Sequence, residues 1–248
     1  MSSTASSRTF VSAFCLLLLA GCAMPRGLFA PRLFKDEFRH GLGAWQIESE
    51  QPGRITAADG VLDIDVPAGV TLWFKQHLSG AVAIEFQATA VSAGGVNDQV
   101  SDLNVFWMAN NIDGVEPVYA RARSGAFAQY NDLLTYYVGL GGNRNTTTRF
   151  RRYIGDPALR PLLPEHDLSA RSAMLVANRP QIITLIANGR SIEYRRDGEP
   201  LFKLDDSAPY SQGWFALRTT FSHLRIRHLR IYRPDGHIGK RRRNGDDR

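Results

Sequence analysis

Apolar residues alternate with polar ones along most of this chain, and a period of two is that of a β-strand. The segments 61–66 and 82–89 show the alternation most clearly. Further strands are expected at 70–75, 102–108, 134–140, 147–153, 181–187, 191–195, 213–219 and 224–232. No segment of ten or more residues has a convincing 3.6-residue period. The pattern therefore predicts an all-β fold.

Turn signals separate these strands at short intervals. Asn188-Gly189 and Asp197-Gly198 each stand between two apolar segments, which predicts a meander of three antiparallel strands. The proline-rich stretch 157–173 is expected to be a long loop with one helical turn. No internal repeat is visible, which argues against a propeller or a solenoid and favours a sandwich or barrel.

The N-terminal segment has the pattern of an export signal. Arg8 precedes an apolar run at 10–20, which is shorter than the about 20 residues that span a bilayer but typical of a signal peptide. The following Leu19-Ala20-Gly21-Cys22 resembles the lipobox of bacterial lipoproteins. That resemblance implies that Cys22 becomes a lipidated N-terminus, carrying palmitate. The alternative is an ordinary secretory signal that ends near a cysteine.

These features divide the chain into four parts. We expect a signal peptide at 1–21, a lipidated cysteine and tether at 22–34, a β-sandwich at 35–233 and a basic disordered tail at 234–248. Ala23 supplies no acidic retention signal. The expected location is the cell envelope, anchored to the membrane by lipid, and the outer membrane if the organism has one.

The cysteine count and the charge exclude several classes of protein. Cys15 and Cys22 are the only cysteines, so the expected domain has neither disulfides nor a thiolate metal site. Of the formal net charge of +6, the segment 239–248 carries +3 and Arg8 carries +1, which leaves +2 for the remainder. So weak a charge does not indicate a nucleic-acid partner.

Several segments resemble the concanavalin A-like (laminarinase and laminin-G type) jelly-roll superfamily. They are the possible opening strand 36–45, the strand-turn-strand unit 194–202, and the closing pair 213–218 and 223–232. The resemblance implies a jelly-roll sandwich of two antiparallel sheets, with a groove on one of them. The superfamily contains glycoside hydrolases, polysaccharide lyases, keto-sugar hydrolases and lectins, so it implies a saccharide partner without fixing a reaction.

The run from Tyr136 to Tyr153 resembles a family of exported bacterial proteins known mainly as a domain of unknown function. Related jelly-roll families occur among genes for pectin and rhamnogalacturonan breakdown. The resemblance thus implies a plant-type or microbial polysaccharide.

Strand parity indicates which side chains point away from the core. Rings among them suit the CH faces of sugars, and arginines suit carboxylates, which together predict a uronate-containing ligand. The glycine-rich loop 139–145 adds two asparagines that tolerate positive φ. The expected substrate-binding residues are Trp73, Gln87, Asp102, Asn104, Asn143, Asn145, Tyr153, Trp214 and Arg218. The alternative is a polar outer face such as every sandwich has.

Two enzymatic schemes fit such a groove. A lyase needs groups that neutralise a carboxylate, with a base and an acid, and the candidates are Tyr137, Arg149, Arg151 and His166, with Asn104. A retaining glycosidase needs two carboxylates about 5–5.5 Å apart, and the Glu-x-Asp-x-x-Glu cluster of jelly-roll glucanases is absent. A lyase is therefore favoured over a glycoside hydrolase.

A non-catalytic carbohydrate-binding lipoprotein is the main alternative to an enzyme. A structural envelope protein is a third hypothesis. No cofactor and no catalytic metal is expected. Asp and Asn residues in loops could hold a structural Ca²⁺.

Overall fold

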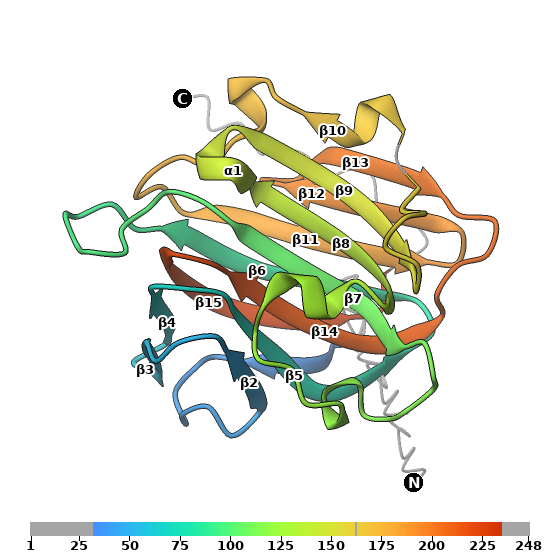
Figure 1. Ribbon diagram of the computed structural model, residues 1–248, viewed down its shortest axis with the longest axis horizontal. Coiled ribbons are helices and arrows are strands. Elements are labelled where there is room, and N and C mark those ends of the chain that lie inside the picture. The colour runs from blue at the N-terminus through green and yellow to red at the C-terminus, as the bar shows by residue number, and fades with distance from the viewer. Residues whose placement is uncertain (1–31, 162, 235–248) are drawn as a thin grey trace, which may run out of the picture.

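The computed structural model describes residues 32–161 and 163–234 as two antiparallel β-sheets packed face to face (Figure 1). The eight-stranded sheet contains β1 (Arg32–Asp36), β3 (Arg54–Ala58), β4 (Val61–Val66), β6 (Val82–Ala90), β11 (Gln181–Asn188), β12 (Ser191–Arg196), β13 (Glu199–Asp205) and β15 (Ser222–Tyr232). The seven-stranded sheet contains β2 (Trp45–Ser49), β5 (Val70–Ser79), β7 (Leu103–Asn111), β8 (Leu133–Gly141), β9 (Thr147–Ile154), β10 (Asp167–Leu168) and β14 (Gln212–Thr219). The predicted all-β jelly-roll sandwich is thus confirmed.

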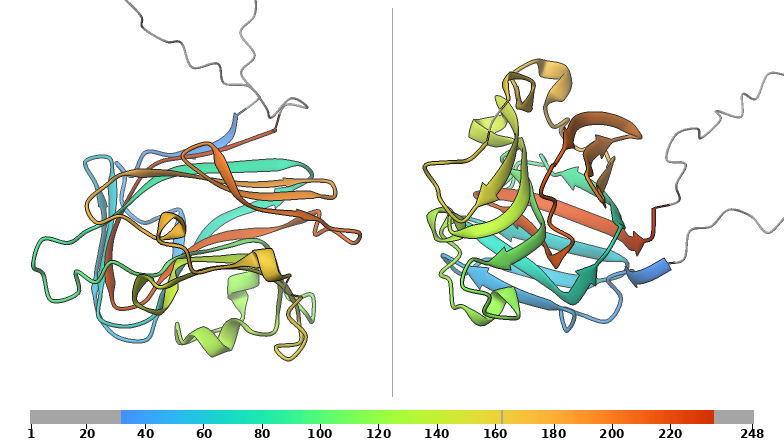
Figure 2. Two further views of the ribbon diagram at one scale, coloured as in Figure 1. Left: turned by 90° about the horizontal axis from the view of Figure 1, so that it is seen from above. Right: turned by 90° about the vertical axis from the view of Figure 1, so that its right-hand side faces the viewer.

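The strand order interleaves segments that are far apart in the sequence. The eight-stranded sheet runs β13-β12-β11-β6-β15-β4-β3, with β1 also paired to β15, and the seven-stranded sheet runs β10-β9-β8-β7-β14-β5-β2. The main core lies between the two sheets (Figure 2), where alternate residues such as Leu62, Val105 and Phe215 are fully buried. The alternation in the sequence therefore marks the faces that form this core.

The helical segments are all short. A turn labelled α1 (Gly142–Asn145) joins β8 to β9. Four 3₁₀ turns, η1 (Val118–Ala120), η2 (Phe127–Tyr130), η3 (Pro164–His166) and η4 (Arg171–Ala173), lie in loops. No helix in the part of the chain that the structure describes is long and apolar enough to cross a membrane.

The predicted meander is present as β11-β12-β13. Asn188 pairs with Ser191 at the end of the first hairpin. Both Asp197 and Gly198 have positive φ, of 53° and 87°, at the second turn, as a tight two-residue hairpin turn requires.

The structure differs from the expectation at the N-terminal edge of the domain. Strand β1 begins at Arg32, inside the stretch expected to be a tether, because Leu33 and Phe34 pack against the core. The segment that resembles an opening strand is instead the turn between β1 and β2, where Asp36 accepts hydrogen bonds from the Phe38 backbone at 2.7 Å and from the Trp45 indole at 2.8 Å. The signal peptide, Cys22 and the basic tail lie outside the described residues.

A second apolar cluster lies on the outer face of the seven-stranded sheet. Residues 112–132, which connect β7 to β8 and are called the covering loop below, lie across this face (Figure 1). Their Val118 and Tyr130 are fully buried against Trp73 and Phe106. Part of this outer face is therefore itself a small core, and the site adjoins it, with Tyr137 and Tyr153 shared between the two.

Candidate functional site

A cavity of about 380 Å³ opens on the outer face of the seven-stranded sheet. Strands β7, β8, β9 and β14 form its floor. It is lined by Glu50, Asp102, Asn104, Phe127, Tyr137, Gly139, Gly142, Asn143, Thr147, Arg149, Arg151, Tyr153, Arg160, Arg218 and Thr220. Its volume lies in the range of about 300–1,000 Å³ typical of small-ligand sites.

Strand register places the polar lining residues in one row across the sheet. Asp167 pairs with Arg149, Arg149 with Gly139, Gly139 with Asn104, and Asn104 with Arg218. Directly opposed side chains in such pairs lie about 4.5–5.5 Å apart at Cβ. Of this row, Arg149, Asn104 and Arg218 bring polar side chains from three strands to the cavity, and Asp167 lies beyond Arg149.

Arg218 is the most buried charged group of the cavity, with 3% of its surface exposed. Its Nη1 donates to Thr71 Oγ1 at 2.8 Å and to the Gly125 carbonyl at 2.7 Å. Its guanidinium carbon lies 5.0 Å from the ring centres of both Phe127 and Tyr130. Burial lowers the pKa of Arg218 below its usual range, and the guanidinium forms no ion pair with any described carboxylate.

Three further arginines line the cavity. Arg149 forms an ion pair with Asp167 at 2.7 Å. Arg151 donates to the Phe150 carbonyl at 2.8 Å, and burial lowers its pKa. The guanidinium of Arg160 lies 4.7 Å from the centre of the Tyr153 ring. Only two carboxylates, Glu50 and Asp102, line the cavity beside these four arginines, so the lining suits an anionic ligand.

A group of neutral oxygens lies beside the arginines. A Cβ on Gly139 would lie 2.6 Å from Tyr137 Oη and 3.1 Å from Asn104 Oδ1. Glycine at this position therefore lets the phenol and the amide approach one another over the backbone. Asn104 Oδ1 is buried and has no hydrogen-bond partner among the described residues, which leaves an acceptor for a ligand.

Tyr137 and Asp102 both have perturbed acidities. Burial is the main cause that raises the pKa of Tyr137, with a contribution from the charge of Asp102. Burial also raises the pKa of Asp102, whose carboxylate accepts hydrogen bonds from Ser101 Oγ and from Asn104 Nδ2. The phenol is thus neutral near pH 7, and the carboxyl group is a better proton acceptor than an exposed aspartate.

The loop between β8 and β9 has an unusual backbone. Asn143, Arg144 and Asn145 have φ of 51°, 57° and 62°, a left-handed turn that asparagine tolerates and that costs a residue such as Arg144 about 1–2 kcal/mol. The side chain of Asn145 compensates by bonding both to the N–H and to the carbonyl of Leu175, at 2.9 and 3.0 Å. Asn143 consequently lines the cavity, whereas Asn145 holds the loop.

The structure does not bring the other expected site residues to the cavity. Trp73 and Trp214 belong to the second apolar cluster, with exposed fractions of 0% and 4%. Gln87 lies on β6, in the other sheet. His166 is buried between Phe150 and Phe202 with Nε2 3.1 Å from the Lys203 carbonyl, on the core side of β9. Arg149 and Arg151 point the opposite way along this strand, so His166 is separated from them by the sheet.

Besides Gly139 and Gly142 of the glycine-rich loop, five lining residues were not expected from the sequence, namely Glu50, Phe127, Thr147, Arg160 and Thr220. Thr147 has the same strand parity as Arg149 and Arg151, and that parity could have identified it. Arg160 and Phe127 lie in long loops, where no periodicity indicates a direction.

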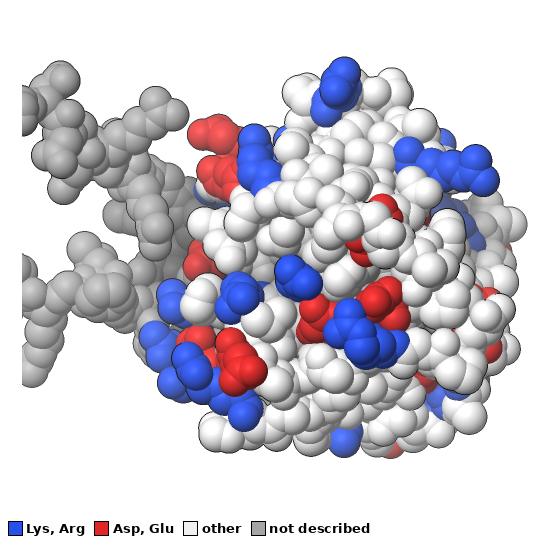
Figure 3. All heavy atoms as spheres, turned by 90° about the vertical axis from the view of Figure 1, so that its left-hand side faces the viewer, with Lys and Arg blue, Asp and Glu red and all other residues white. Residues whose placement is uncertain are grey.

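Charged side chains are mixed over the surface. On the face shown in Figure 3, lysines and arginines lie among acidic side chains in small groups, without one continuous basic area in the coloured part. Among residues 32–161 and 163–234, no group of three or more His, Cys, Asp and Glu side chains could hold a metal ion. A structural Ca²⁺ therefore stays a prediction.

Solved structures similar to this chain share its fold at low sequence identity. A Bacillus subtilis protein of unknown function with a galectin-like fold is 15% identical, with 82% of this chain and 96% of that chain covered and a TM-score of 0.63. The metal-free carbohydrate recognition domain of Emp46p is 13% identical, with coverages of 77% and 88% and a TM-score of 0.55. LamA from Z. galactanivorans in complex with laminaritriose and laminaritetraose is 13% identical, with coverages of 82% and 99% and a TM-score of 0.53. These likenesses establish the galectin-like jelly roll.

A search of curated proteins found no match. The sequence pattern of one family, described as a domain of unknown function (DUF6250), matches residues 64–229. That range runs from β4 into β15 and includes most of the residues that line the cavity. The chain belongs to the DUF6250 family.

Proposed function

We propose that the cavity binds an acidic saccharide and that Arg218 receives the carboxylate of a uronic acid. The observation that carries the proposal is the burial of Arg218 at the cavity without a carboxylate partner among the described residues. A buried guanidinium costs free energy unless it is paired. A ligand carboxylate would offset that cost and accept two parallel hydrogen bonds from the planar group.

The rest of the lining supports a sugar over a simple anion. The ring of Phe127, which is 38% exposed, supplies apolar surface for the CH face of a pyranose, and Asn104 and Asn143 supply hydrogen-bonding groups for its hydroxyls. Of the structures that share the fold, that of Emp46p is a carbohydrate recognition domain and that of LamA is a complex with laminaritriose and laminaritetraose. Another similar structure comes from work on endo-acting O-glycanases that start mucin breakdown.

Catalysis by β-elimination is the second candidate, and the grouping of Asp102, Asn104 and Tyr137 favours it. Arg218 at the uronate carboxylate would make the proton at C5 more acidic. Asp102 would take that proton, the C4=C5 double bond would form, and the bond from C4 to the glycosidic oxygen would break. Neutral Tyr137 would donate its proton to the leaving oxygen. His166 has no part in this scheme because it lies on the core side of the sheet.

The test uses the full chain with a panel of uronate oligosaccharides, including tetragalacturonate and alginate-derived tetramers. Titration calorimetry should show binding, and Arg218→Lys should weaken it at least tenfold because an ammonium cannot form the bidentate pair. Arg149→Ala should weaken it several-fold. Its matched control is Arg225→Ala, since Arg225 is similarly half-exposed and paired to an aspartate on the other sheet.

The same mixtures distinguish an enzyme from a binding protein. An increase in the ultraviolet absorbance of unsaturated uronate that Asp102→Asn and Tyr137→Phe abolish would establish β-elimination. Binding without such an increase would establish a non-catalytic carbohydrate-binding protein. Absence of binding across the panel would refute the acidic-saccharide proposal.

We also propose that the protein is exported and anchored to the cell envelope through a lipid on Cys22. The support is the apolar run followed by Leu19-Ala20-Gly21-Cys22. Cells fed labelled palmitate should incorporate it into the protein, and Cys22→Ser should abolish incorporation, whereas Cys15→Ser should not. Equal labelling of the Cys22 variant would contradict the anchor.

A further inference from the structure

The covering loop (residues 112–132) forms a wall at one end of the cavity. Its Gly125 touches two turns at the edge of the sheet: a Cβ there would lie 2.7 Å from the Glu50 N and 2.9 Å from the Gly69 carbonyl oxygen. The carbonyl of Gly125 also accepts the hydrogen bond from Arg218. Phe127, next along the loop, packs at 5.4 Å between ring centres against Tyr137. The wall thus directly adjoins the proposed carboxylate site.

The polar row across the sheet continues behind this wall. Arg218 pairs with Thr71, and Thr71 pairs with Glu48. In an open groove, Thr71 and Glu48 would contact the sugar unit adjacent to the one bound at Arg218. Here Thr71 has no exposed surface and Glu48 has 6%. The row is therefore accessible only from Arg218 toward Arg149, whose side chain is 41% exposed at the opposite end.

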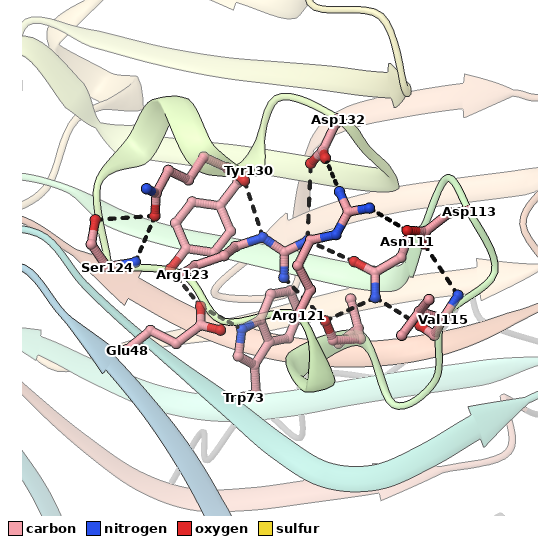
Figure 4. Close-up of polar contacts among 12 residues, drawn as sticks. Glu48, Trp73, Asn111, Asp113, Val115, Arg121, Arg123, Ser124, Tyr130 and Asp132 are labelled. Atoms are coloured by element: carbon pink, nitrogen blue, oxygen red, sulfur yellow. Dashed lines mark hydrogen bonds and ion pairs between the residues drawn. The ribbon is translucent and has the colours of Figure 1, made fainter.

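Buried polar contacts hold the wall in place (Figure 4). Glu48 Oε2 accepts hydrogen bonds from Tyr130 Oη at 2.6 Å and from Trp73 Nε1 at 3.0 Å. Arg123 donates to Asn111 Oδ1 at 2.6 Å and, at 3.0 Å each, to the carbonyls of Val118 and Gln129. These bonds tie the loop both to the sheet and to itself.

We propose that the cavity receives the end of an acidic saccharide chain, with the terminal uronate at Arg218 and the remainder leaving past Arg149. The inference rests on the proposed function and narrows its ligand to chain termini and short oligosaccharides. A chain lying across the sheet would have to pass through the packed contact of Gly125 with Glu50 and Gly69. We therefore expect the interior of a long polymer lying along this row not to reach Arg218.

The test compares tetragalacturonate with polygalacturonates of two known mean lengths, by titration calorimetry on the full chain. We expect one protein molecule per saccharide chain at every length, with equal affinity per chain. A number of bound molecules that grows with chain length would overturn this inference and leave the acidic-saccharide proposal intact. If neither oligomer nor polymer binds, the proposed function fails and this inference fails with it.

A pair of loop variants sharpens the test. Arg123→Ala removes the buried bonds that hold the loop to itself and to Asn111 at the end of β7, and it should raise the number of molecules bound per long chain. Arg121→Ala is the matched control, because Arg121 forms only surface ion pairs with Asp113 and Asp132 on the same loop. Circular dichroism of both variants checks that the sandwich is retained. If the Arg123→Ala variant folds and still binds as one protein molecule per polygalacturonate chain, the role of the wall is contradicted.

Discussion

Asn104 and Arg218 are register partners on β7 and β14, and both are 3% exposed where they line the cavity. The amide presents an acceptor oxygen without a partner among the described residues, and the guanidinium presents donors without a carboxylate. The unpartnered oxygen of Asn104 thus lies on the strand next to a guanidinium that donates to Thr71 and Gly125 but has no ion pair with a described carboxylate. That combination suits a carboxylate next to a hydroxyl, which is the arrangement on a uronic acid.

Replacing Asn104 with aspartate should place a carboxylate of the protein itself beside Arg218, where the ligand carboxylate is proposed to bind. The new carboxylate would compete with a ligand for Arg218, so we expect at least a tenfold loss of affinity for uronate oligosaccharides. Folding stability should also fall, because the change removes the hydrogen bond from Asn104 Nδ2 to Asp102 and places two carboxyl groups side by side. Calorimetric titration and thermal denaturation measure the two effects. Asn110→Asp, on the same strand but outside the cavity, is the control. Undiminished affinity in Asn104→Asp would contradict the role of Arg218.

Gly139→Ala should disturb the site because the added Cβ would lie 2.6 Å from Tyr137 Oη. Overpacking of this kind costs about 1–3 kcal/mol, and we expect affinity to fall as the phenol and Asn104 separate. Gly43→Ala is the control, since nothing lies within 4 Å of its Cβ position. Equal melting temperatures for the two variants would show that the cavity adapts freely.

Tyr130→Phe should loosen the covering loop. The change removes a 2.6 Å hydrogen bond to Glu48, a carboxylate that is 6% exposed, and bonds of this type contribute about 1.5–3 kcal/mol. Urea denaturation measures the loss. Tyr119→Phe, in the same loop and half-buried, should change stability little. A loss of stability in Tyr119→Phe but not in Tyr130→Phe would contradict the role given to the hydrogen bond between Tyr130 and Glu48.

Glu48 also predicts a dependence of stability on pH. Burial raises its pKa above the ordinary value of 4.5, so the folded protein retains a proton that the unfolded chain has lost. Stability contributed by this group therefore falls as the pH rises from about 4.5 through the folded pKa. Glu48→Gln should flatten that part of the stability profile. A profile unchanged from the wild type would show that Glu48 ionises normally.

Asp98 predicts the opposite dependence at lower pH. Backbone N–H groups of Gly95 and Ala93 donate to it and lower its pKa to about 2, with His223 contributing. Its stabilising contribution is complete above the ordinary pKa of 3.8 and disappears as the pH falls through about 2. Asp98→Ala should cost about 1–3 kcal/mol at pH 7 and much less at pH 2. A cost that does not vary with pH would refute this account.

The alternation of residues predicted the strands because burial between two sheets imposes a period of two, as at Leu62 and Ile64. Parity also correctly predicted that Arg149 and Arg151 point to the opposite face of the sheet from Phe150. It could not say which sheet a strand joins, so Gln87 and Asn104 were grouped although they lie in different sheets. That assignment depends on strand order, which is set by contacts distant in sequence.

Loops account for the remaining differences. Trp73 points away from the sandwich core as parity indicates, but the covering loop buries it. His166 and Arg160 lie in the same proline-rich stretch, one on the core side and one at the cavity. Such directions follow from the packing of each loop against its neighbours, for which the sequence carries no periodic signal.

The second apolar cluster has a thermodynamic consequence for recognition. Because Tyr130 and Val118 are packed as firmly as core residues, the wall beside Arg218 is built when the chain folds and does not have to be ordered by the ligand. Binding therefore avoids the conformational entropy that a closing lid would lose. The cavity is preorganised, and its affinity reflects the contacts it makes with the saccharide.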